Sequence, residues 1–236
     1  MKSSKQIPVV TIDGPGGSGK GTVAQILAGH LGWHYLDSGA LYRVLGLMAQ
    51  RRGVSLEDEP ALCRLAVGLR IDFVPQPDGS AAQVRVDGTD VSAELRTEAS
   101  GELASRVAVL PAVRTGLLQK QHDFRQIPGL VTDGRDMGTT VFTDALLKVY
   151  LTASAEIRAE RRYKQLKEKG FDANLQRILG EIRHRDARDT GRSVSPLKPA
   201  DDAWILDSST LNTNEVVEAV SRRLQARLAG SPAGSV

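Results

Sequence analysis

The sequence predicts an α/β fold in which a parallel sheet is flanked by helices on both faces. Two observations support this prediction. Short apolar runs rich in β-branched residues recur along the chain, and segments with apolar residues at helical spacing separate them. Strands that alternate with helices in this way form parallel sheets, because each crossover lays a helix over one face of the sheet.

The first strand and helix are predicted at the start of the chain. "IPVVTI", residues 7–12, is a short run typical of a buried parallel strand. A helix begins near Gly21, places four apolar residues on one side and ends at Gly32, since glycine is favoured just past a helix terminus. The pattern continues with a strand at 33–36, a turn at 37–39 and a helix over 40–52.

Further along, one stretch departs from this alternation. Residues 69–92 show period-two alternation on either side of turn residues Pro75 to Ser80, which predicts a small inserted antiparallel sheet. Residues 104–118 read as an amphipathic helical stretch. The remaining predicted elements are strands within 129–141, 146–153 and 202–209, a helix over 214–228 and a disordered tail at 231–236.

Composition excludes several classes of protein. With 236 residues, 41% hydrophobic and 25% charged, the chain is long enough for one sizeable globular domain. No apolar run reaches the roughly 18 residues of a spanning helix, and the N-terminus lacks the pattern of a signal peptide, so we expect a cytoplasmic protein without membrane association. Cys63 is the single cysteine, which excludes an intramolecular disulfide and favours a structural role for this thiol.

A glycine-rich loop follows the first predicted strand. "GPGGSGK", which ends at Lys20, matches the phosphate-binding motif G-x-x-x-x-G-K and stands between a strand and a helix, as the motif requires. Loop N–H groups, the helix N-terminus and the lysine all favour an anion there. The motif departs from its general form, because Gly21 occupies the position of a metal-binding Ser or Thr and the hydroxyl comes at Thr22. Mg²⁺ would then rely more on phosphate oxygens and water.

Two further motifs follow predicted strands. "LVTDGRDMG" places Asp133, Arg135 and Asp136 at a strand end, where ligands bind in open α/β sheets, although a solvated turn with a local ion pair would also fit. "LDSGALYR" offers Ser38, Tyr42 and Arg43 on one side of a helix start, although an ordinary capped helix has the same pattern.

The excess of basic over acidic residues lies in one segment. The chain has a net charge of +3, and residues 156–192 hold 11 Lys and Arg against 7 Asp and Glu. Arg185, Arg188 and Arg192 recur at helical spacing. A solvated helix face is one interpretation, and nucleic-acid binding is disfavoured by the lack of interleaved aromatic residues. We favour a movable helical lid whose arginines neutralise a transferring phosphoryl group, with flexible points at Gly170 and Gly191.

Taken in order and at these separations, "TIDGPGGSGKGT", "LDSGALYR", "DGRDMGT" and "RDARDTGR" resemble the bacterial cytidylate kinases, a family of nucleoside monophosphate kinases, over about residues 8–228. The resemblance implies transfer of the ATP γ-phosphoryl group to CMP or dCMP in pyrimidine nucleotide metabolism, with Mg²⁺. It also implies a P-loop NTPase core with an inserted antiparallel β subdomain in the monophosphate-binding region and a helical lid. The implied parts are a core at 7–62, 107–155 and 201–228, an insert at about 63–106 and a lid at about 156–200.

The resemblance also assigns roles to individual residues. The ATP phosphates would lie on Gly14, Pro15, Gly16, Gly17, Ser18, Gly19, Lys20, Gly21 and Thr22. CMP would be bound by Ser38, Tyr42, Arg43, Ser105, Arg114, Arg135, Asp136, Asp189 and Arg192. The catalytic residues would be Lys20, Arg161, Arg185, Arg188 and Arg192, and Asp133 would stand near Mg²⁺ through water.

The chemistry of the reaction agrees with the residues found. A monophosphate acceptor is already an anion, so the reaction needs alignment and charge neutralisation rather than a strong base. The four histidines lie outside the predicted strand-end turns. Three other classes are alternatives: a GTPase switch, which would carry an N-K-x-D signature absent from the chain, a kinase for a hydroxylated acid such as shikimate, and a nucleic-acid-binding module. We expect a monomer that binds CMP, dCMP and ATP.

Overall fold

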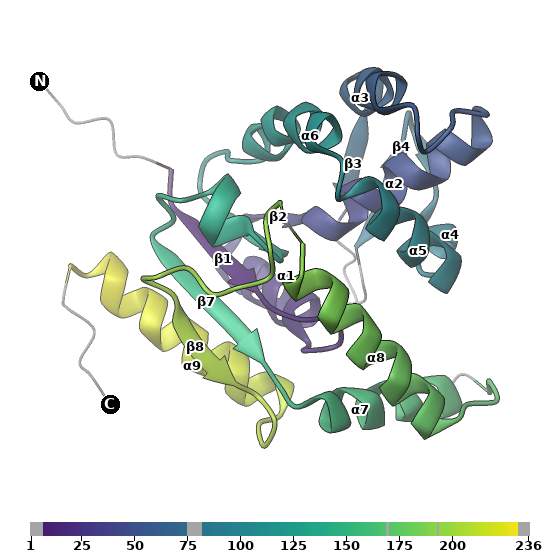
Figure 1. Ribbon diagram of the computed structural model, residues 1–236. Coiled ribbons are helices and arrows are strands. Elements are labelled where there is room, and N and C mark those ends of the chain that lie inside the picture. Colours follow the sequence, from purple (N-terminus) through teal and green to yellow (C-terminus); the bar gives the residue numbers. More distant parts are fainter. Residues whose placement is uncertain (1–6, 75–81, 169, 193, 231–236) are drawn as a thin grey trace, which may run out of the picture.

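The centre of the computed structural model is a five-stranded parallel sheet with the strand order β2-β6-β1-β7-β8 (Figure 1). The strands are β1 (Val9–Asp13), β2 (His34–Asp37), β6 (Leu130–Gly134), β7 (Leu147–Thr152) and β8 (Trp204–Asp207). The structure describes residues 7–74, 82–168, 170–192 and 194–230. Each neighbouring pair of strands runs parallel, which confirms the predicted α/β fold.

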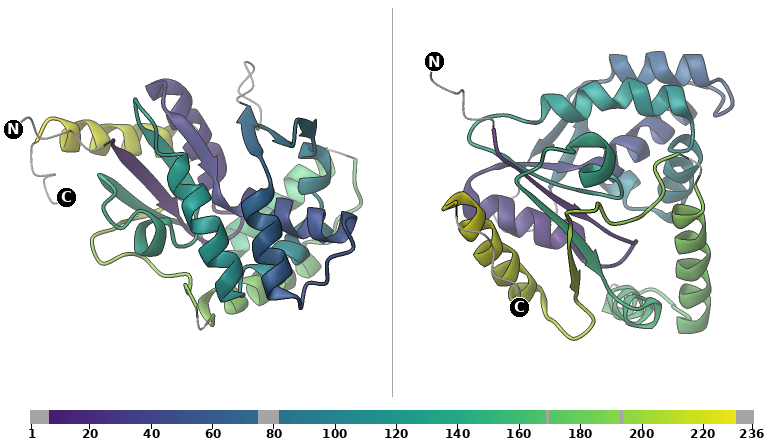
Figure 2. Two further views of the ribbon diagram at one scale, coloured as in Figure 1. Left: turned by 90° about the horizontal axis from the view of Figure 1, so that it is seen from above. Right: turned by 60° about the vertical axis from the view of Figure 1, so that its left-hand side comes forward.

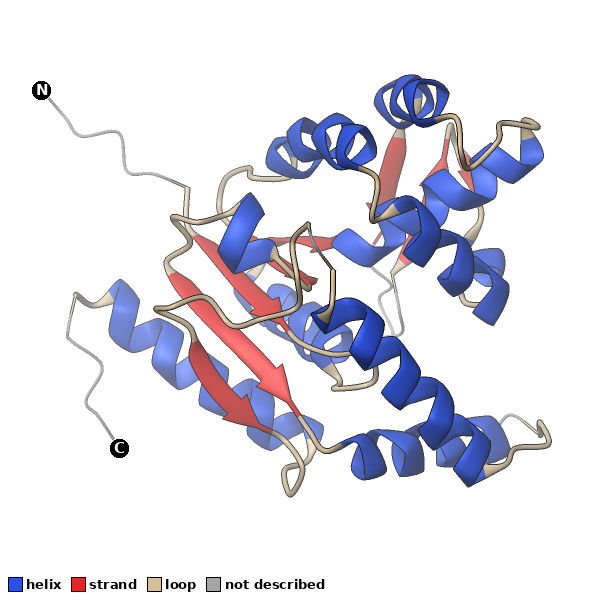
Figure 3. Cartoon of the chain, viewed as in Figure 1, coloured by secondary structure: helices blue, strands red, loops and turns tan. Residues whose placement is uncertain are grey.

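Helices cover both faces of this sheet, as Figures 2 and 3 show. One face packs against α1 (Lys20–Leu31) and α9 (Thr213–Leu228). The other packs against α2 (Ser38–Arg51), α6 (Pro111–Asp123) and the π-helical turn η1 (Met137–Val141). Side chains alternate between the faces along a strand. In β1, Val10 and Ile12 lie in the core with α1, whereas Val9 lies in the core with α2.

The inserted antiparallel sheet is also present. It consists of β3 (Ile71–Val74), β4 (Gln83–Val86) and β5 (Thr89–Asp90). Its neighbours in the chain are the helices α3 (Glu59–Gly68), α4 (Ser92–Leu95) and α5 (Glu98–Val107). The predicted turn at Pro75 to Ser80 lies outside the described residues. Cys63, on α3, is half-buried.

A helical pair extends from the carboxyl edge of the sheet. The helix α7 (Ala155–Glu168) follows β7, and α8 (Leu175–Thr190) packs against it and returns toward α1 and α5 (Figure 1). This pair occupies the segment that carries the excess of basic over acidic residues. Among the described helices, none combines the length and the apolar character needed to cross a bilayer.

The turn predicted at 37–39 is wrong, because α2 begins at Ser38 directly after β2. The side chain of Asp37 accepts a hydrogen bond from the backbone N–H of Ala40 at 3.0 Å. This cap satisfies one of the donors exposed at the helix start and allows the strand to pass into the helix without a separate turn.

The predicted helical stretch at 104–118 is two helices. α5 ends at Val107 and α6 begins at Pro111, with Pro111 in the first turn of α6. Proline fits the first turn of a helix but not its interior, which explains the break. The predicted disordered tail at 231–236 lies outside the described residues.

Candidate active site

The glycine-rich loop lies between β1 and α1 at the carboxyl end of the sheet. Gly14 has no room for a side chain, because a Cβ there would stand 2.0 Å from the backbone oxygen of Leu151. Gly19 caps α1 with a φ of 87°, a conformation that favours glycine. The loop can therefore present backbone N–H groups and the positive end of α1 to one place, which suits an anion.

Lys20 begins α1 and folds back over the loop, where its Nζ donates to the backbone oxygen of Pro15 at 3.1 Å. Burial, followed by repulsion from Arg135, lowers the pKa of Lys20 from 10.5 to about 8. Arg185 adds to this repulsion. Its guanidinium lies close to the loop, because a Cβ added at Gly16 would stand 3.5 Å from it. An anion such as phosphate would relieve the crowding of these cationic groups.

Two carboxylates lie at the ends of neighbouring strands beside the loop. Asp37 and Asp133 are opposite one another across β2 and β6, and the Tyr35 hydroxyl donates to Oδ1 of Asp133 at 2.8 Å. Burial, and then the charge of Asp37, raise the pKa of Asp133 from 3.8 to about 7. Gly21 faces the same carboxylate, since a Cβ added at Gly21 would stand 3.7 Å from Oδ2 of Asp133.

These carboxylates fit a Mg²⁺ ion. Mg²⁺ prefers oxygen ligands and keeps several of its waters. A cation here would also reduce the repulsion from Asp37 that contributes to the raised pKa of Asp133. Within the described ranges, no group of three or more His, Cys, Asp or Glu side chains is arranged to hold a metal. Most ligands of such an ion would therefore be waters or phosphate oxygens.

The turn after β6 carries two residues into a network of buried ion pairs. Asp136 pairs with Arg114, and Arg135 pairs with Asp189, which also pairs with Arg192. Burial by itself would raise the pKa of Asp189, but Arg135 and Arg192 outweigh it and the pKa is lowered. Three guanidinium groups around two carboxylates leave a positive charge that can meet an anionic ligand.

Two polar side chains of α2, Ser38 and Tyr42, lie near this network. The buried amide of Gln121 donates to Oγ of Ser38 at 2.9 Å, so the hydroxyl proton of Ser38 can serve another acceptor. The ring of Tyr42 lies 5.8 Å from the guanidinium of Arg114. Burial raises the pKa of Tyr42 to about 12, which keeps its hydroxyl a neutral donor.

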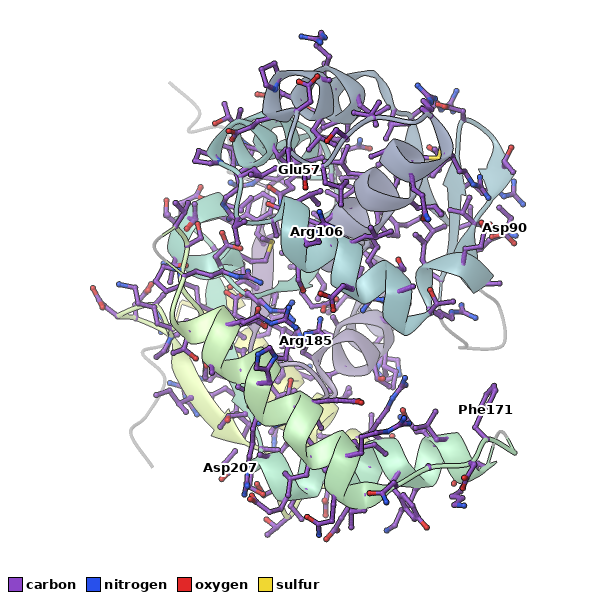
Figure 4. The ribbon with its side chains drawn as sticks, turned by 45° about the vertical axis from the view of Figure 1, so that its right-hand side comes forward. Glu57, Asp90, Arg106, Phe171, Arg185 and Asp207 are labelled. Atoms are coloured by element: carbon purple, nitrogen blue, oxygen red, sulfur yellow. The ribbon has the colours of Figure 1, made fainter. Side chains whose placement is uncertain are left out.

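Most of the predicted site residues line a single cavity of about 260 Å³. They are Gly16, Gly17, Lys20, Gly21, Ser38, Tyr42, Arg43, Ser105, Arg114, Asp133, Arg135, Asp136, Arg185 and Arg192. Figure 4 shows Arg185 on α8, where this helix faces the rest of the chain. The fold thus brings the loop, the strand-end motifs and Arg185 and Arg192 to one opening.

Other predicted residues lie elsewhere. The Nη2 of Arg161 donates to the backbone oxygen of Ser208 at 2.6 Å, beyond the end of β8. Arg188 is exposed, with its Nη1 3.7 Å from Oε1 of Glu102, and it lines a neighbouring cavity. Asp189 is buried behind Arg135 and does not line the main cavity. The other residues of the loop outside the cavity lining are Gly14, Pro15, Ser18, Gly19 and Thr22.

Two buried residues that the sequence analysis did not select support the site. Asp13 accepts hydrogen bonds from the backbone N–H groups of Met137 at 2.9 Å and Gly138 at 2.8 Å, so the end of β1 fixes the turn after β6. Its place just before the first glycine of the loop could have identified it. Arg158 contacts the loop directly, but spacing alone does not separate it from Arg161 in the "RAERR" run.

Comparison with known proteins gives one consistent family. Residues 10–226 match the family model of cytidylate kinase. A cytidylate kinase from Stutzerimonas stutzeri is 58% identical over 216 residues, which cover 92% of this chain and 94% of the relative. A cytidylate kinase from Shewanella denitrificans is 52% identical over 225 residues, which cover 95% of this chain and 99% of the relative.

Solved structures agree with the fold. The crystal structure of an uncharacterised protein from Eubacterium ventriosum matches with a TM-score of 0.51 at 10% identity, and the match covers 93% of this chain and 99% of that one. At this identity the likeness bears on the fold alone.

Proposed function

The chain belongs to the cytidylate kinase family, and we propose that the cavity described above is the site of the family's reaction. The chain is a kinase that transfers the γ-phosphoryl group of ATP to CMP or dCMP, giving ADP and CDP or dCDP. One observation supports the placement of the site above all: the glycine-rich loop and the Arg114–Asp136 pair open into the same cavity. One end of the cavity then suits the donor phosphates and the other the acceptor nucleotide.

The phosphates of ATP bind on the loop from Gly14 to Thr22. The positive end of α1 and the crowded cations Lys20 and Arg185 support this placement, because a polyphosphate relieves their mutual repulsion. Binding of ATP should accordingly raise the pKa of Lys20, since phosphate oxygens favour the charged ammonium.

CMP binds at the end formed by α2, α5, α6 and the turn after β6. This region offers hydroxyl and guanidinium donors together with a carboxylate acceptor, the mixture that a cytosine edge and a monophosphate need. The residues proposed to contact CMP are Ser38, Tyr42, Arg43, Ser105, Arg114, Arg135, Asp136 and Arg192, with Asp189 holding Arg135 and Arg192 in place.

Catalysis follows from alignment and neutralisation of charge. The acceptor oxygen belongs to a phosphate that is already ionised, so no side chain has to remove a proton from a poor nucleophile. Lys20, Arg185 and Arg192 stand around the cavity with donors for the oxygens of the transferring group. Arg161 and Arg188 can join them only if α7 and α8 move, with Gly170 and Gly191 as the flexible points next to α8.

Asp133 would hold Mg²⁺ through water, with Asp37 beside it. The ion supplies charge neutralisation on the ATP phosphates when it is bound. The raised pKa of Asp133 and the second carboxylate, Asp37, opposite it on the neighbouring strand support this assignment. Removal of divalent cations with EDTA should abolish turnover, and Mg²⁺ should restore it.

The chain divides into the core, the insert at about 63–106 and the lid at about 156–200. We propose that it acts as a monomer, and light scattering of the purified protein tests this. A cytoplasmic location suits an enzyme of free nucleotides with a single cysteine.

The test is production of ADP from ATP and Mg²⁺ with CMP, dCMP, UMP, AMP, GMP and shikimate offered separately. We expect high turnover with CMP and dCMP. If both fail while another acceptor supports turnover, the assignment to cytidine monophosphates is wrong; turnover with shikimate would favour a kinase of hydroxylated acids.

A further inference from the structure

We propose that Arg158 is a positioning residue that holds the helix α8, and with it Arg185, against the phosphate-binding loop. Its side chain is 5% exposed and lies outside the set of residues assigned to the reaction above. The inference rests on the proposed function, since it gives Arg185 a role at the transferring phosphoryl group.

The guanidinium of Arg158 joins three parts of the chain. Its Nη1 donates to the backbone oxygen of Gly16 in the loop at 3.0 Å, and its Nε donates to the backbone oxygen of Ala153 after β7 at 3.0 Å. Its Nη1 and Nη2 also donate to the carboxylate of Asp186 on α8, at 3.0 and 2.5 Å. Four of the five N–H groups of the guanidinium are thereby used.

The geometry requires arginine in particular. The planar fork meets the carboxylate of Asp186 with two parallel hydrogen bonds while it serves two carbonyl groups, which a single ammonium group cannot reproduce. The aliphatic stem runs close to the loop, because a Cβ added at Gly17 would stand 3.4 Å from Cβ of Arg158. The guanidinium of this side chain contacts the loop at Gly16, and its stem leaves little room for a side chain at Gly17.

The position of Asp186 connects this cluster to the reaction. Asp186 follows Arg185 directly on α8, and a Cβ added at Gly16 would stand 3.5 Å from the guanidinium of Arg185. Arg158 therefore binds the backbone carbonyl of Gly16, and Arg185 lies close to the same residue. If the pair of Arg158 and Asp186 is broken, α8 loses its attachment to the loop and Arg185 loses its alignment. This loss lowers the rate, because even small displacements of catalytic groups are costly.

A second ion pair between the same two helices provides a matched control. Arg183 of α8 and Glu156 of α7 are 2.7 Å apart, but their side chains are 62% and 55% exposed. Solvent screens such a pair, and it does not contact the loop. If α8 merely needed any salt bridge to α7, the two pairs would matter equally.

The experiment compares Arg158→Met, Asp186→Asn and the double variant with Arg183→Met and Glu156→Gln. Methionine keeps most of the stem under Gly17, and asparagine keeps the shape of Asp186. We expect kcat with CMP to fall roughly a hundredfold in each single variant of the buried pair, with the KM for CMP changed by less than about threefold. The double variant should lose no more than Arg158→Met alone, because the two side chains act as a unit.

Hydrogen exchange of the α8 amides gives a readout that needs no turnover. Exchange should accelerate in both variants of the buried pair and stay unchanged in the variants of the exposed pair. Arg158→Lys should not restore kcat. Independent, additive losses, or a kcat effect of equal size in the control pair, would overturn the inference, as would unchanged α8 exchange in well-folded Arg158→Met.

Failure of the proposed function gives a different result. If the unaltered chain does not phosphorylate CMP, the acceptor assignment is wrong, while the exchange measurements still decide whether Arg158 and Asp186 hold α8. If the unaltered chain is active but the variants behave as the control pair does, only the role of Arg158 is wrong.

Discussion

Replacement of Asp13 by Asn should change how the stability of the protein depends on pH. Asp13 is 5% exposed, and its carboxylate accepts hydrogen bonds from the backbone N–H groups of Met137 and Gly138. Burial outweighs these bonds and raises the pKa of Asp13 from 3.8 to about 6. The folded protein therefore binds this proton more tightly than the unfolded chain does.

The direction and size of the effect follow from this difference in pKa. Between 3.8 and about 6 the folded state binds more protons than the unfolded state, so stability falls as the pH rises through this window. From pH 4.5 to pH 7.5 the unaltered protein should lose about 2 kcal/mol of unfolding free energy relative to Asp13→Asn, which has no such titration. Urea denaturation of both proteins at the two pH values measures this change.

Asp202→Asn serves as a control with the opposite sign. Asp202 pairs with Lys148, and this hydrogen bond lowers the pKa of the Asp202 carboxyl. Its contribution to stability is present above the unfolded pKa and is lost as the pH falls. The difference between Asp202→Asn and the unaltered protein should be unchanged or slightly larger at pH 7.5. If the difference between Asp13→Asn and the unaltered protein is the same at both pH values, the burial of Asp13 does not act as described.

Three further predictions concern the cavity. Lys20→Met should lower kcat by about two to three powers of ten, because one preorganised cation at the phosphates is lost; steady-state kinetics with saturating CMP measures this, and an unchanged kcat would remove Lys20 from the catalytic residues. Asp133→Asn should raise the Mg²⁺ concentration for half-maximal activity by about tenfold or more, seen in a Mg²⁺ titration at fixed ATP; an unaltered requirement would place the ion elsewhere. Arg114→Met leaves buried Asp136 without this partner, so it should reduce the unfolding free energy by about 3 kcal/mol and raise the KM for CMP. Urea denaturation measures the first effect and steady-state kinetics with CMP the second; the absence of either effect would contradict the role given to this pair.

The sequence was sufficient for the features that depend on local pattern. The strand at 7–12, the loop through Lys20 and the helix that ends at Gly32 follow from apolar runs and glycine positions, and the structure has all three. The inserted sheet follows from period-two alternation. The turn at 37–39 was mispredicted because the cap by Asp37 removes the need for one, a contact that composition does not reveal.

The features that depend on distant contacts could not be predicted. Asp13 and Met137 are far apart in the sequence and meet only because β1 and β6 are neighbours in the sheet. Arg158 and Arg161 stand in the same arginine-rich run, but the helix turns the first toward Gly16 and the second toward Ser208. Which arginine reaches the loop is decided by the direction in which α7 leaves the sheet.

The central claim is that the cavity aligns the donor and acceptor phosphates and transfers the phosphoryl group between them. The most direct test follows the label from [γ-³²P]ATP in the presence of Mg²⁺ and CMP, with nucleotides and inorganic phosphate separated afterwards. We predict that the label appears in CDP, with little in inorganic phosphate. Label released mainly as inorganic phosphate, or transferred to another acceptor while CMP remains unlabelled, would contradict the account.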